Sequence, residues 1–459
     1  MGLEALQPLI NLMPEVEVPK EKPALKERLK WTGVALVIFA FLGIILPVGM
    51  GSTQQSGFLQ NLQLITASKI GTLATLGIGP IVMASIILQL LVGAKIINLD
   101  LHNPENKKLF QGVQKLFALA FCIFEASIYV MSGFVPAQPG LLNAFLVIAQ
   151  LAAGAIILLF LDEVVSKYGI GSGVGMFIAA GVSFTIVWQA FSWTTTATGT
   201  FVGLIPQILQ GVITGEAPET AIYPIIFTVL VFLLVVYAES IKLEVPLTFG
   251  KIRGYGAKYP LKFFYVSNIP VILAAALFAN VQLWGVAMSG MGFPLLGHFD
   301  QNQPIDGIAH YLRAPYGDLS TPTKVALTLG NFDAILNIIV YSIAMVVFCI
   351  VFGKFWVDMS NMDAKSVASQ LQTVGLHVPG FRRDPRVIEM VLKRYIPMIT
   401  LIGSATVGLV AVLADLTGAL GTGTGILLTV GIVYRMYEEL AAQQAFEMMP
   451  ALKALLGEA

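Results

Sequence analysis

Few residues in this 459-residue sequence have the types and spacing that catalysis or metal binding requires. The four histidines, at positions 102, 298, 310 and 377, are too scattered for the short spacings typical of metal ligands. The acidic pair Asp162-Glu163 ends an apolar segment, where a solvated or capping role is more common than catalysis. No phosphate-binding G-x-x-x-x-G-K-[ST] loop is present. The sequence therefore argues against an enzyme and predicts no cofactor, metal or nucleotide site.

Glycine spacing is more informative. Residues 171–175 read GSGVG and residues 421–425 read GTGTG, and each leads directly into an apolar run. Pro80 and Pro270 are expected to interrupt two further apolar segments at matching places. Small residues also let membrane helices pack closely. Paired interruptions in two halves of a chain, however, favour a central pathway.

Composition indicates a membrane protein. The chain is 56% hydrophobic and 12% charged, with a mean hydropathy of +0.80, whereas soluble domains carry about 25% charged residues. A spanning helix needs about 20 apolar residues. Ten segments qualify: 31–49, 74–94, 110–133, 141–161, 171–192, 222–241, 262–285, 334–357, 391–414 and 420–440. The weaker piece 57–70 is either an external loop or a half-helix folded back into the protein.

Basic residues predict the orientation. If the N-terminus is inside, only Lys69, Arg313 and Lys324 of the 27 Lys and Arg residues lie outside. The positive-inside rule then places both termini in the cytoplasm of a multi-pass cell-membrane protein. Ten spans divide into two halves of five, and an odd number per half inverts one half relative to the other. The predicted fold is an all-α polytopic membrane protein with ten transmembrane helices in two inverted five-helix halves.

This topology predicts a domain organisation. The regions are an N-terminal cytoplasmic segment 1–30, a first half 31–192, an external linker 193–221, a second half 222–440 with basic cytoplasmic loops 242–262 and 358–394, and a cytoplasmic tail 441–459.

The predicted pathway carries no charge at mid-membrane. The residues beside the interruptions are all apolar: Ile78, Val82, Val174, Ile178, Ile272 and Leu428. An ion-coupled transporter needs ionisable residues there, whereas an apolar constriction excludes ions by dewetting. Glu125 lies inside the third span at a depth similar to Asn280, and forms either an interhelical hydrogen bond or a polar latch at a gate. The basic loops weakly indicate docking of an acidic partner, RNA included.

Four long stretches carry a family resemblance. They are LATLGIGPIV (73–82), LDEVVSKYGIGSGVGMFIAAGV (161–182), KYPLKFFYVSNIPVILAAALFANVQLWG (258–285) and GTGTGILLTVGIVYRMYEEL (421–440). Over nearly its whole length the sequence resembles the archaeal SecY family, the central subunits of the protein-conducting translocon.

The resemblance implies a channel that secretes polypeptides and releases transmembrane segments into lipid through a lateral gate between spans 2/3 and 7/8. The six apolar residues beside the interruptions would form its pore ring. Segment 57–70 would be the plug, a re-entrant half-helix that includes Leu62, Leu64, Ile65, Thr66, Ala67, Ser68 and Lys69. Gln89, Glu125 and Asn280 would lie at the gate. Met83 stands where the family often has a polar threonine.

The resemblance also implies partners. They are SecE-type and Secβ-type small membrane subunits, the ribosome, signal-bearing nascent or secretory polypeptides, and the lipid bilayer. The residues expected to dock the ribosome are Lys251, Arg253, Lys258, Arg382, Arg383 and Arg386. Residues Leu3, Leu6, Ile10 and Met13 form one stripe of an expected interfacial helix.

Two other classes remain as alternatives. A small-solute secondary transporter with inverted repeats would share the topology, but the charge-free centre and the long basic loops argue against it. A membrane scaffold without a conduit would leave the paired interruptions unexplained.

Overall fold

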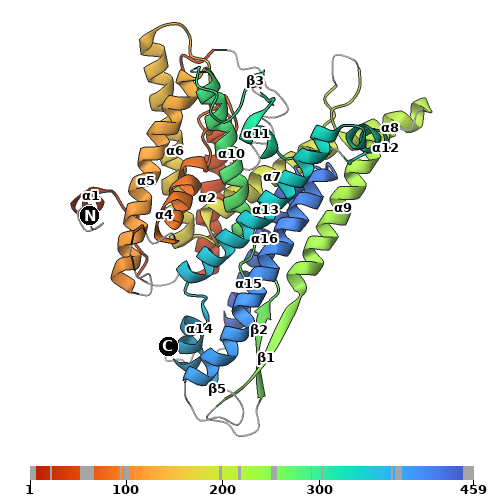
Figure 1. Ribbon diagram of the computed structural model, residues 1–459. Helices are drawn as coiled ribbons and strands as arrows, with labels where there is room; N and C mark the ends of the chain where they lie inside the picture. Colours follow the sequence, from red (N-terminus) through yellow and green to blue (C-terminus); the bar gives the residue numbers. More distant parts are fainter. Residues whose placement is uncertain are drawn as a thin grey trace.

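Ten helices form the apolar body of the protein (Figure 1). The computed structural model describes residues 7–20, 23–51, 67–93, 96–97, 99, 103–195, 199–215, 219–249, 256–290, 292–300, 303–317, 319–373, 376–377 and 385–447. Within them the ten helices are α2 (Leu25–Leu42), α4 (Gly79–Gly93), α5 (Pro104–Met131), α6 (Leu141–Tyr168), α7 (Gly173–Phe191), α9 (Glu219–Ser240), α10 (Ile269–Gly290), α13 (Phe332–Met359), α15 (Pro385–Leu416) and α16 (Gly423–Glu447).

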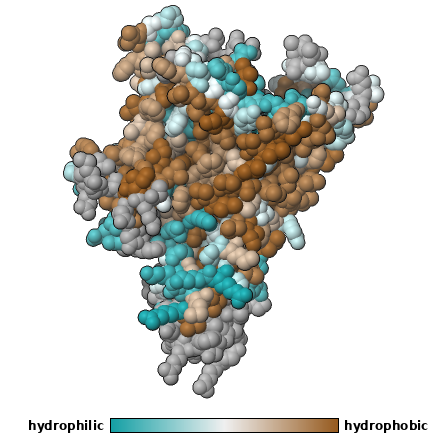
Figure 2. Space-filling model, in the orientation of Figure 1, coloured by the Kyte–Doolittle hydropathy of each residue, from teal (hydrophilic) through white to brown (hydrophobic). Residues whose placement is uncertain are grey.

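Each of the ten expected spans coincides with one of these helices. In the described part of the chain, seven helices are long and apolar enough to cross a membrane by themselves. The other three are α4, which has only 15 residues, and α2 and α16, which carry charged residues toward one end. The apolar surface forms a broad belt around the helices, with hydrophilic residues gathered below it (Figure 2). Such a belt is the surface that lipid requires.

Several helices begin or end away from their expected positions. The second span was expected from residue 74 and the seventh from residue 262, but α4 begins at Gly79 and α10 at Ile269. Pro80 and Pro270 are therefore the second residues of their helices. The expectation that these prolines interrupt helices is wrong. A proline in the first turn breaks no hydrogen bond, because the N–H groups there have no intrahelical partner.

The two basic loops, which are expected to be cytoplasmic, contribute strands to one small sheet that the sequence did not predict. Strands β1 (Lys242–Phe249) and β2 (Gly256–Lys262) make an antiparallel hairpin. Strand β5 (Leu376–His377), from the other loop, adds to the free edge of β1 with Thr248 opposite His377. The signal was present, because the β1 sequence KLEVPLTF alternates polar and apolar residues. Helix α14 (Ala364–Thr373) packs beside it on α15.

Short elements cover the opposite end of the molecule. Helix α8 (Leu204–Thr214) precedes α9, and α11 (Gly307–Tyr311) and α12 (Pro322–Leu329) precede α13. Strands β3 (Phe299–Asp300) and β4 (Gln303–Pro304) form a two-stranded ribbon between α10 and α11. This end lies far from the β1–β2 hairpin in Figure 1.

The N-terminal segment is tied to the body by one ionic cluster. Glu163 of α6 pairs with Lys115 of α5 at 2.7 Å and with Lys167 at 2.9 Å. The Val16 amide donates to the same carboxylate at 3.3 Å, and Lys167 also pairs with Glu15 at 3.0 Å. The short helix α1 (Gln7–Leu12) packs against α5. The described part of the N-terminal segment is thus held against the ends of α5 and α6.

Candidate functional site

Six apolar side chains belong to, or pack against, one large buried cluster of the helix assembly. Ile78, Val82, Ile178 and Leu428 belong to the largest buried cluster, and Val174 and Ile272 pack against it from partly buried positions. Ile178 is fully buried and Leu428 is 1% exposed. These are the six residues that the sequence places beside the interruptions. The structure brings them together from four helices, α4, α7, α10 and α16, or from the turn just before α4.

All four helices begin beside this cluster, and each is preceded by the same backbone feature. A residue with positive φ lies two positions before the first helical residue of each one. These residues are Gly77 (55°), Gly171 (70°), Ser267 (56°) and Gly421 (67°). A left-handed residue turns the chain sharply and ends any preceding regular structure. The same turn therefore precedes each of the four helices that carry the six apolar residues.

Two aspartates fix the start of α7 and the start of α16 in the same way. Asp162 of α6 accepts a hydrogen bond from the Val174 amide at 2.7 Å. Asp415 of α15 accepts one from the Thr424 amide at 2.8 Å. A side-chain oxygen at this place satisfies a helix N–H group that has no partner within its helix.

The glycines of the two leaders permit this close approach. A Cβ on Gly173 would lie 2.5 Å from the Cα of Asp162, and a Cβ on Gly423 would lie 1.9 Å from the carbonyl carbon of Ala414. Any side chain at either position would push the pathway helix away from its anchor. The middle glycine of each leader is therefore required for packing against the preceding helix.

Asp415 is the centre of a larger buried network. Besides the Thr424 amide, its carboxylate accepts hydrogen bonds from the Tyr341 hydroxyl at 3.0 Å, the Tyr316 hydroxyl at 3.3 Å and the Thr424 hydroxyl at 2.5 Å. Burial raises the pKa of the Tyr316 phenol well above its usual value, and the nearby Asp415 charge adds to the effect. The phenol therefore stays a neutral donor. The network joins α13, α15, α16 and the external loop before α12.

A polar group missed by the sequence analysis lies between α10 and α16. The Asn268 side chain, 2% exposed, donates to the Leu427 carbonyl at 2.9 Å. Its own oxygen and the buried Oε1 of Glu239 have no hydrogen-bond partner among the described residues. Both side chains face Gly431, where an added Cβ would lie 2.7 Å from the Asn268 Cγ and 2.9 Å from the Glu239 Oε1. The signal in the sequence was an Asn directly before the apolar run that starts α10.

The described end of the expected plug reaches the central cluster. Ala67 is 3% exposed and belongs to the same buried cluster as Ile78. The carbonyl of Lys69 accepts a hydrogen bond from the Thr72 hydroxyl at 2.6 Å, while the Lys69 side chain is exposed. Ser68 is half-buried. The other expected plug residues, Leu62, Leu64, Ile65 and Thr66, lie outside the described residues.

The expected gate residues are buried but not joined by hydrogen bonds. Glu125 and Asn280 are each 1% exposed. The Asn280 amide donates to Ala276 of its own helix at 2.9 Å, and neither Glu125 oxygen has a hydrogen-bond partner among the described residues. Glu125 Oε2 instead lies 3.3 Å from the position of a Cβ on Gly79, at the start of α4. Gln89 donates to Ser85 within α4 at 2.8 Å.

The seam between the two halves is closed by direct packing. Near the external end, residues of α5 such as Cys122 and Ala126 share a buried cluster with Ala279 and Leu283 of α10. At the other end of α4, a Cβ on Gly93 would lie 2.5 Å from the Phe355 ring of α13. Helices α4 and α5 therefore contact α10 and α13 along the line where a lateral gate is expected.

Most of the expected docking residues cannot be placed. Lys251, Arg253, Arg382 and Arg383 lie outside the described residues. The backbone of Lys258 is in β2 opposite Pro246, and Arg386 is exposed at the start of α15. At the base of the hairpin, Lys242 and Lys262 both pair with Glu438 of α16. The hairpin is thereby attached to a helix that reaches the centre of the protein.

Known proteins match this chain over nearly its full length. The SecY family model matches residues 72–437. The protein translocase subunit SecY of Methanocaldococcus jannaschii is 49% identical over 456 residues, covering 99% of this chain and all of that protein. The SecY subunit of Haloferax volcanii is 37% identical, covering 99% of both chains.

Solved structures agree with the sequence comparison. A structure described as that of a protein conducting channel superposes with a TM-score of 0.84 at 49% identity, covering 97% of this chain and 99% of that one. A second, from work on how the plug domain of SecY stabilises the closed channel, has a TM-score of 0.82 at 48% identity, covering 97% of this chain and 99% of that one. The predicted ten-helix membrane fold is thereby confirmed, and the chain belongs to the SecY family.

Proposed function

We propose that this chain is the central pore-forming subunit of a protein-conducting channel in the cell membrane, with both termini in the cytoplasm. It translocates secretory polypeptides and releases transmembrane segments sideways into lipid. The observation that carries the proposal is that six apolar residues, from four helices or the turn before one of them, share one buried cluster. An apolar ring closes around an extended chain without binding it, and it excludes hydrated ions.

The lateral gate separates α4 and α5 from α10 and α13. When this seam opens, a segment in the pore partitions between water and lipid according to its hydrophobicity. Leucine at the centre of a helix favours the membrane by about 0.5 kcal/mol, whereas a central lysine or aspartate disfavours it by about 3 kcal/mol. Because these contributions add over about 20 residues, an apolar segment leaves the channel and a polar one crosses it.

The partners follow from the family. Among solved structures, a Sec61 channel in a canine ribosome-channel complex has a TM-score of 0.81 at 49% identity. The ribosome would dock on the three-stranded cytoplasmic sheet and the basic segments 242–262 and 358–394 that supply its strands, which carry Lys251, Arg253, Lys258, Arg382, Arg383 and Arg386. Two small single-span subunits, of SecE and Secβ type, would complete the complex. Translation by the docked ribosome would supply the driving force.

A crosslinking experiment tests the pathway. A photo-crosslinker at Ile272 or Leu428 is expected to form adducts with a secretory nascent chain stalled on the ribosome. The matched control is the same crosslinker at Leu233, which is 60% exposed on the outer face of α9. Adducts at Leu233 but at neither Ile272 nor Leu428 would exclude the six residues as the pore ring.

A leak measurement tests the seal. Replacing both Ile272 and Leu428 by glycine widens the apolar ring, so ion leak through reconstituted vesicles is expected to rise. The control is the pair Leu233→Gly and Leu230→Gly on the exposed face of α9. An unchanged leak in the Ile272 and Leu428 variant, with the protein folded, would argue against an apolar seal.

A further inference from the structure

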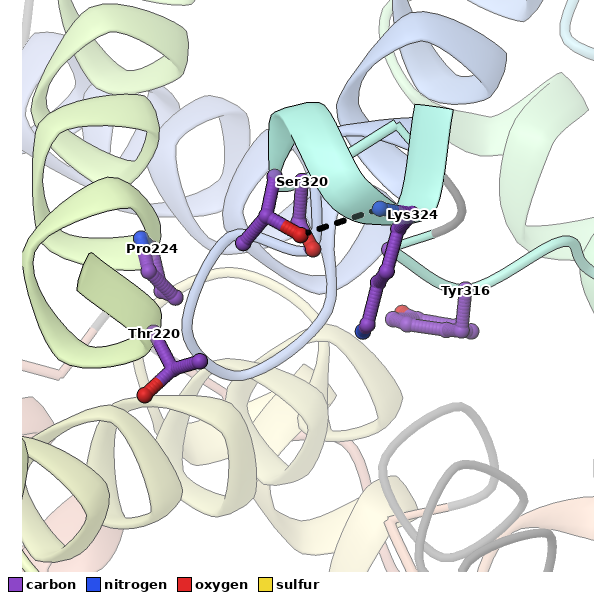
Figure 3. Close-up of a pocket in the computed structure, with 8 residues that line it drawn as sticks. Thr220, Pro224, Tyr316, Ser320 and Lys324 are labelled. Carbon is purple, nitrogen blue, oxygen red and sulfur yellow. Dashed lines mark hydrogen bonds between the residues drawn. The ribbon is translucent and has the colours of Figure 1, made fainter. Parts of the chain in front are cut away.

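An open pocket lies at the end of the molecule opposite the cytoplasmic sheet. Its volume is about 260 Å³, and its walls come from three separate parts of the chain. Thr220 and Pro224 of α9 form one side and Lys324 and Tyr316 the other, with Ser320 between them (Figure 3). No step of polypeptide conduction uses this pocket, which lies away from the six central apolar residues.

Backbone hydrogen bonds give the pocket a fixed floor. The Gly317 amide donates to the Asp415 carbonyl at 3.0 Å, and the Leu319 amide donates to the Leu416 carbonyl at 3.1 Å. Gly317 and Gly418 both have positive φ, and a Cβ on Gly418 would lie 2.9 Å from the Gly317 Cα. The loop before α12 is therefore held tightly against the turn between α15 and α16.

Two groups that lack protein partners converge over this floor. The Lys324 ammonium makes no ion pair with a described residue. Ser320 is only 6% exposed, and its hydroxyl makes no hydrogen bond within the described part of the chain. Both the Lys324 Nζ and the Ser320 Oγ lie within 3.7 Å of the point that a Cβ on Gly317 would occupy. The Ser320 hydroxyl lines the open pocket, so it can donate a hydrogen bond to a ligand oxygen there.

The chemistry of the walls selects an oxyanion. The Lys324 ammonium and the Ser320 hydroxyl, both lining the pocket, match the oxygens of a phosphate group. Ammonium groups are common phosphate ligands and act as point charges.

Neighbouring helices indicate the depth of the pocket in the membrane. Helix α8, which packs on α9, exposes Val212 (76%) and Ile213 (86%), and α12, which carries Lys324, exposes Leu327 (70%) and Leu329 (66%). Exposed apolar residues on short helices at the edge of an apolar belt are typical of helices that lie in the membrane interface. The phosphate groups of lipids are found at this depth.

From this convergence we infer that the pocket binds the phosphate group of an anionic lipid in the external leaflet. The bound lipid holds α9, the loop before α12 and the turn between α15 and α16 together at the membrane surface. Because this turn leads directly into the start of α16, lipid binding stabilises the external end of the second half.

Native mass spectrometry of the purified full-length chain in detergent tests the inference. Short-chain phosphatidylglycerol is titrated in one arm and inorganic phosphate in the other. Lys324→Met is expected to weaken phosphatidylglycerol binding about tenfold, because one charge-assisted contact is lost. Ser320→Ala is expected to weaken it by a smaller factor, and Lys324→Arg should retain most of the affinity.

The matched control is Arg313→Met, which removes a cation of the same external loop that does not line the pocket. Its affinity for phosphatidylglycerol should equal that of the unmodified chain. If the Lys324→Met variant binds phosphatidylglycerol as tightly as the unmodified chain does, the proposed site is wrong. If inorganic phosphate shows the Lys324 dependence and phosphatidylglycerol does not, the lipid assignment is wrong. Lys324 is exposed, so its substitution should leave the fold intact.

Discussion

Asp162 and Asp415 are single residues with corresponding roles in the two halves. Asp162 lies in the last two turns of α6 and Asp415 in the last turn of α15, and each accepts a hydrogen bond from the second residue of the next pathway helix, either Val174 or Thr424. Their partners lie 12 and 9 positions away in the sequence. The sequence analysis considered a capping role for the Asp162-Glu163 pair but gave no role to Asp415. Pairing across two helices depends on how those helices fold back on each other.

Asp415→Ala is expected to destabilise the protein strongly. The change leaves the Tyr341 and Tyr316 hydroxyls and the Thr424 amide and hydroxyl without their acceptor in a buried site. Each lost partner costs about 1–3 kcal/mol, so a total of about 3 kcal/mol or more is expected. Thermal unfolding in detergent measures the loss. Asp333→Ala, at a carboxylate with a 57% exposed side chain, is the control and should change stability by less than about 0.5 kcal/mol.

Among the four positive-φ residues that lie two positions before a pathway helix, Ser267 is the one that is not glycine; Thr422, with a φ of 66°, also precedes α16. A left-handed conformation costs a residue with a Cβ about 1–2 kcal/mol, a cost that glycine does not have. Ser267→Gly is therefore expected to leave stability within about 0.5 kcal/mol, because relief of strain offsets the added chain entropy. Ser342→Gly, within α13, should cost about 1 kcal/mol. Thermal unfolding measures the stability of both variants. If Ser267→Gly and Ser342→Gly lose the same stability, Ser267 is not strained.

At the scale of elements, the long apolar runs determine the ten helices and the turns determine where they begin. The expected spans 74–94 and 262–285 included residues that form turns before α4 and α10, because hydropathy does not distinguish an apolar turn from an apolar helix. The cytoplasmic hairpin was missed although β1 alternates, because the basic loops were considered only for their charge. The addition of β5 to its edge involves a second loop more than 100 residues later, which local sequence does not reveal.

The base of the hairpin gives a prediction at this scale. Glu438→Gln removes the negative charge that pairs with Lys242 and Lys262, whose side chains are 41% and 34% exposed. Partly exposed pairs contribute about 0.2–1 kcal/mol, so hydrogen exchange of the β1 and β2 amides should accelerate by up to about fivefold. Glu389→Gln, which breaks a similar pair with Lys393 on α15, should leave the hairpin unchanged. If the β1 and β2 amides exchange at the same rate in the Glu438→Gln and Glu389→Gln variants, the stability of the hairpin does not depend on its ion pairs with α16.

At the scale of the whole molecule, function requires the two halves to separate along one seam. The end of α10 meets the end of α5 there, and a Cβ on Gly290 would lie 4.0 Å from the Cβ of Ser132. This distance is within the range of disulfide-linked cysteines, about 3.5–4.5 Å. The closed seam thus provides a site for a reversible lock.

A double variant with Ser132→Cys and Gly290→Cys is expected to form a disulfide under oxidation and to stop insertion of transmembrane segments. Reduction should restore insertion into vesicles. The single variants are controls, since the two native cysteines, Cys122 and Cys349, are buried and unpaired. Undiminished insertion by the oxidised double variant, with the crosslink verified by mass spectrometry, would place the lateral exit elsewhere.

The sequence by itself determined the membrane class and the number of spans, and it singled out six apolar residues beside the glycine leaders and the two prolines. Hydropathy, the distribution of basic residues and the glycine leaders are local properties that need no knowledge of contacts. Only the tertiary structure decided that these six residues share one buried cluster, that two aspartates anchor two of their helices, and that the two basic loops form one sheet. Each of these depends on segments far apart in the chain. Their proximity results from the packing of whole helices, which local sequence does not specify.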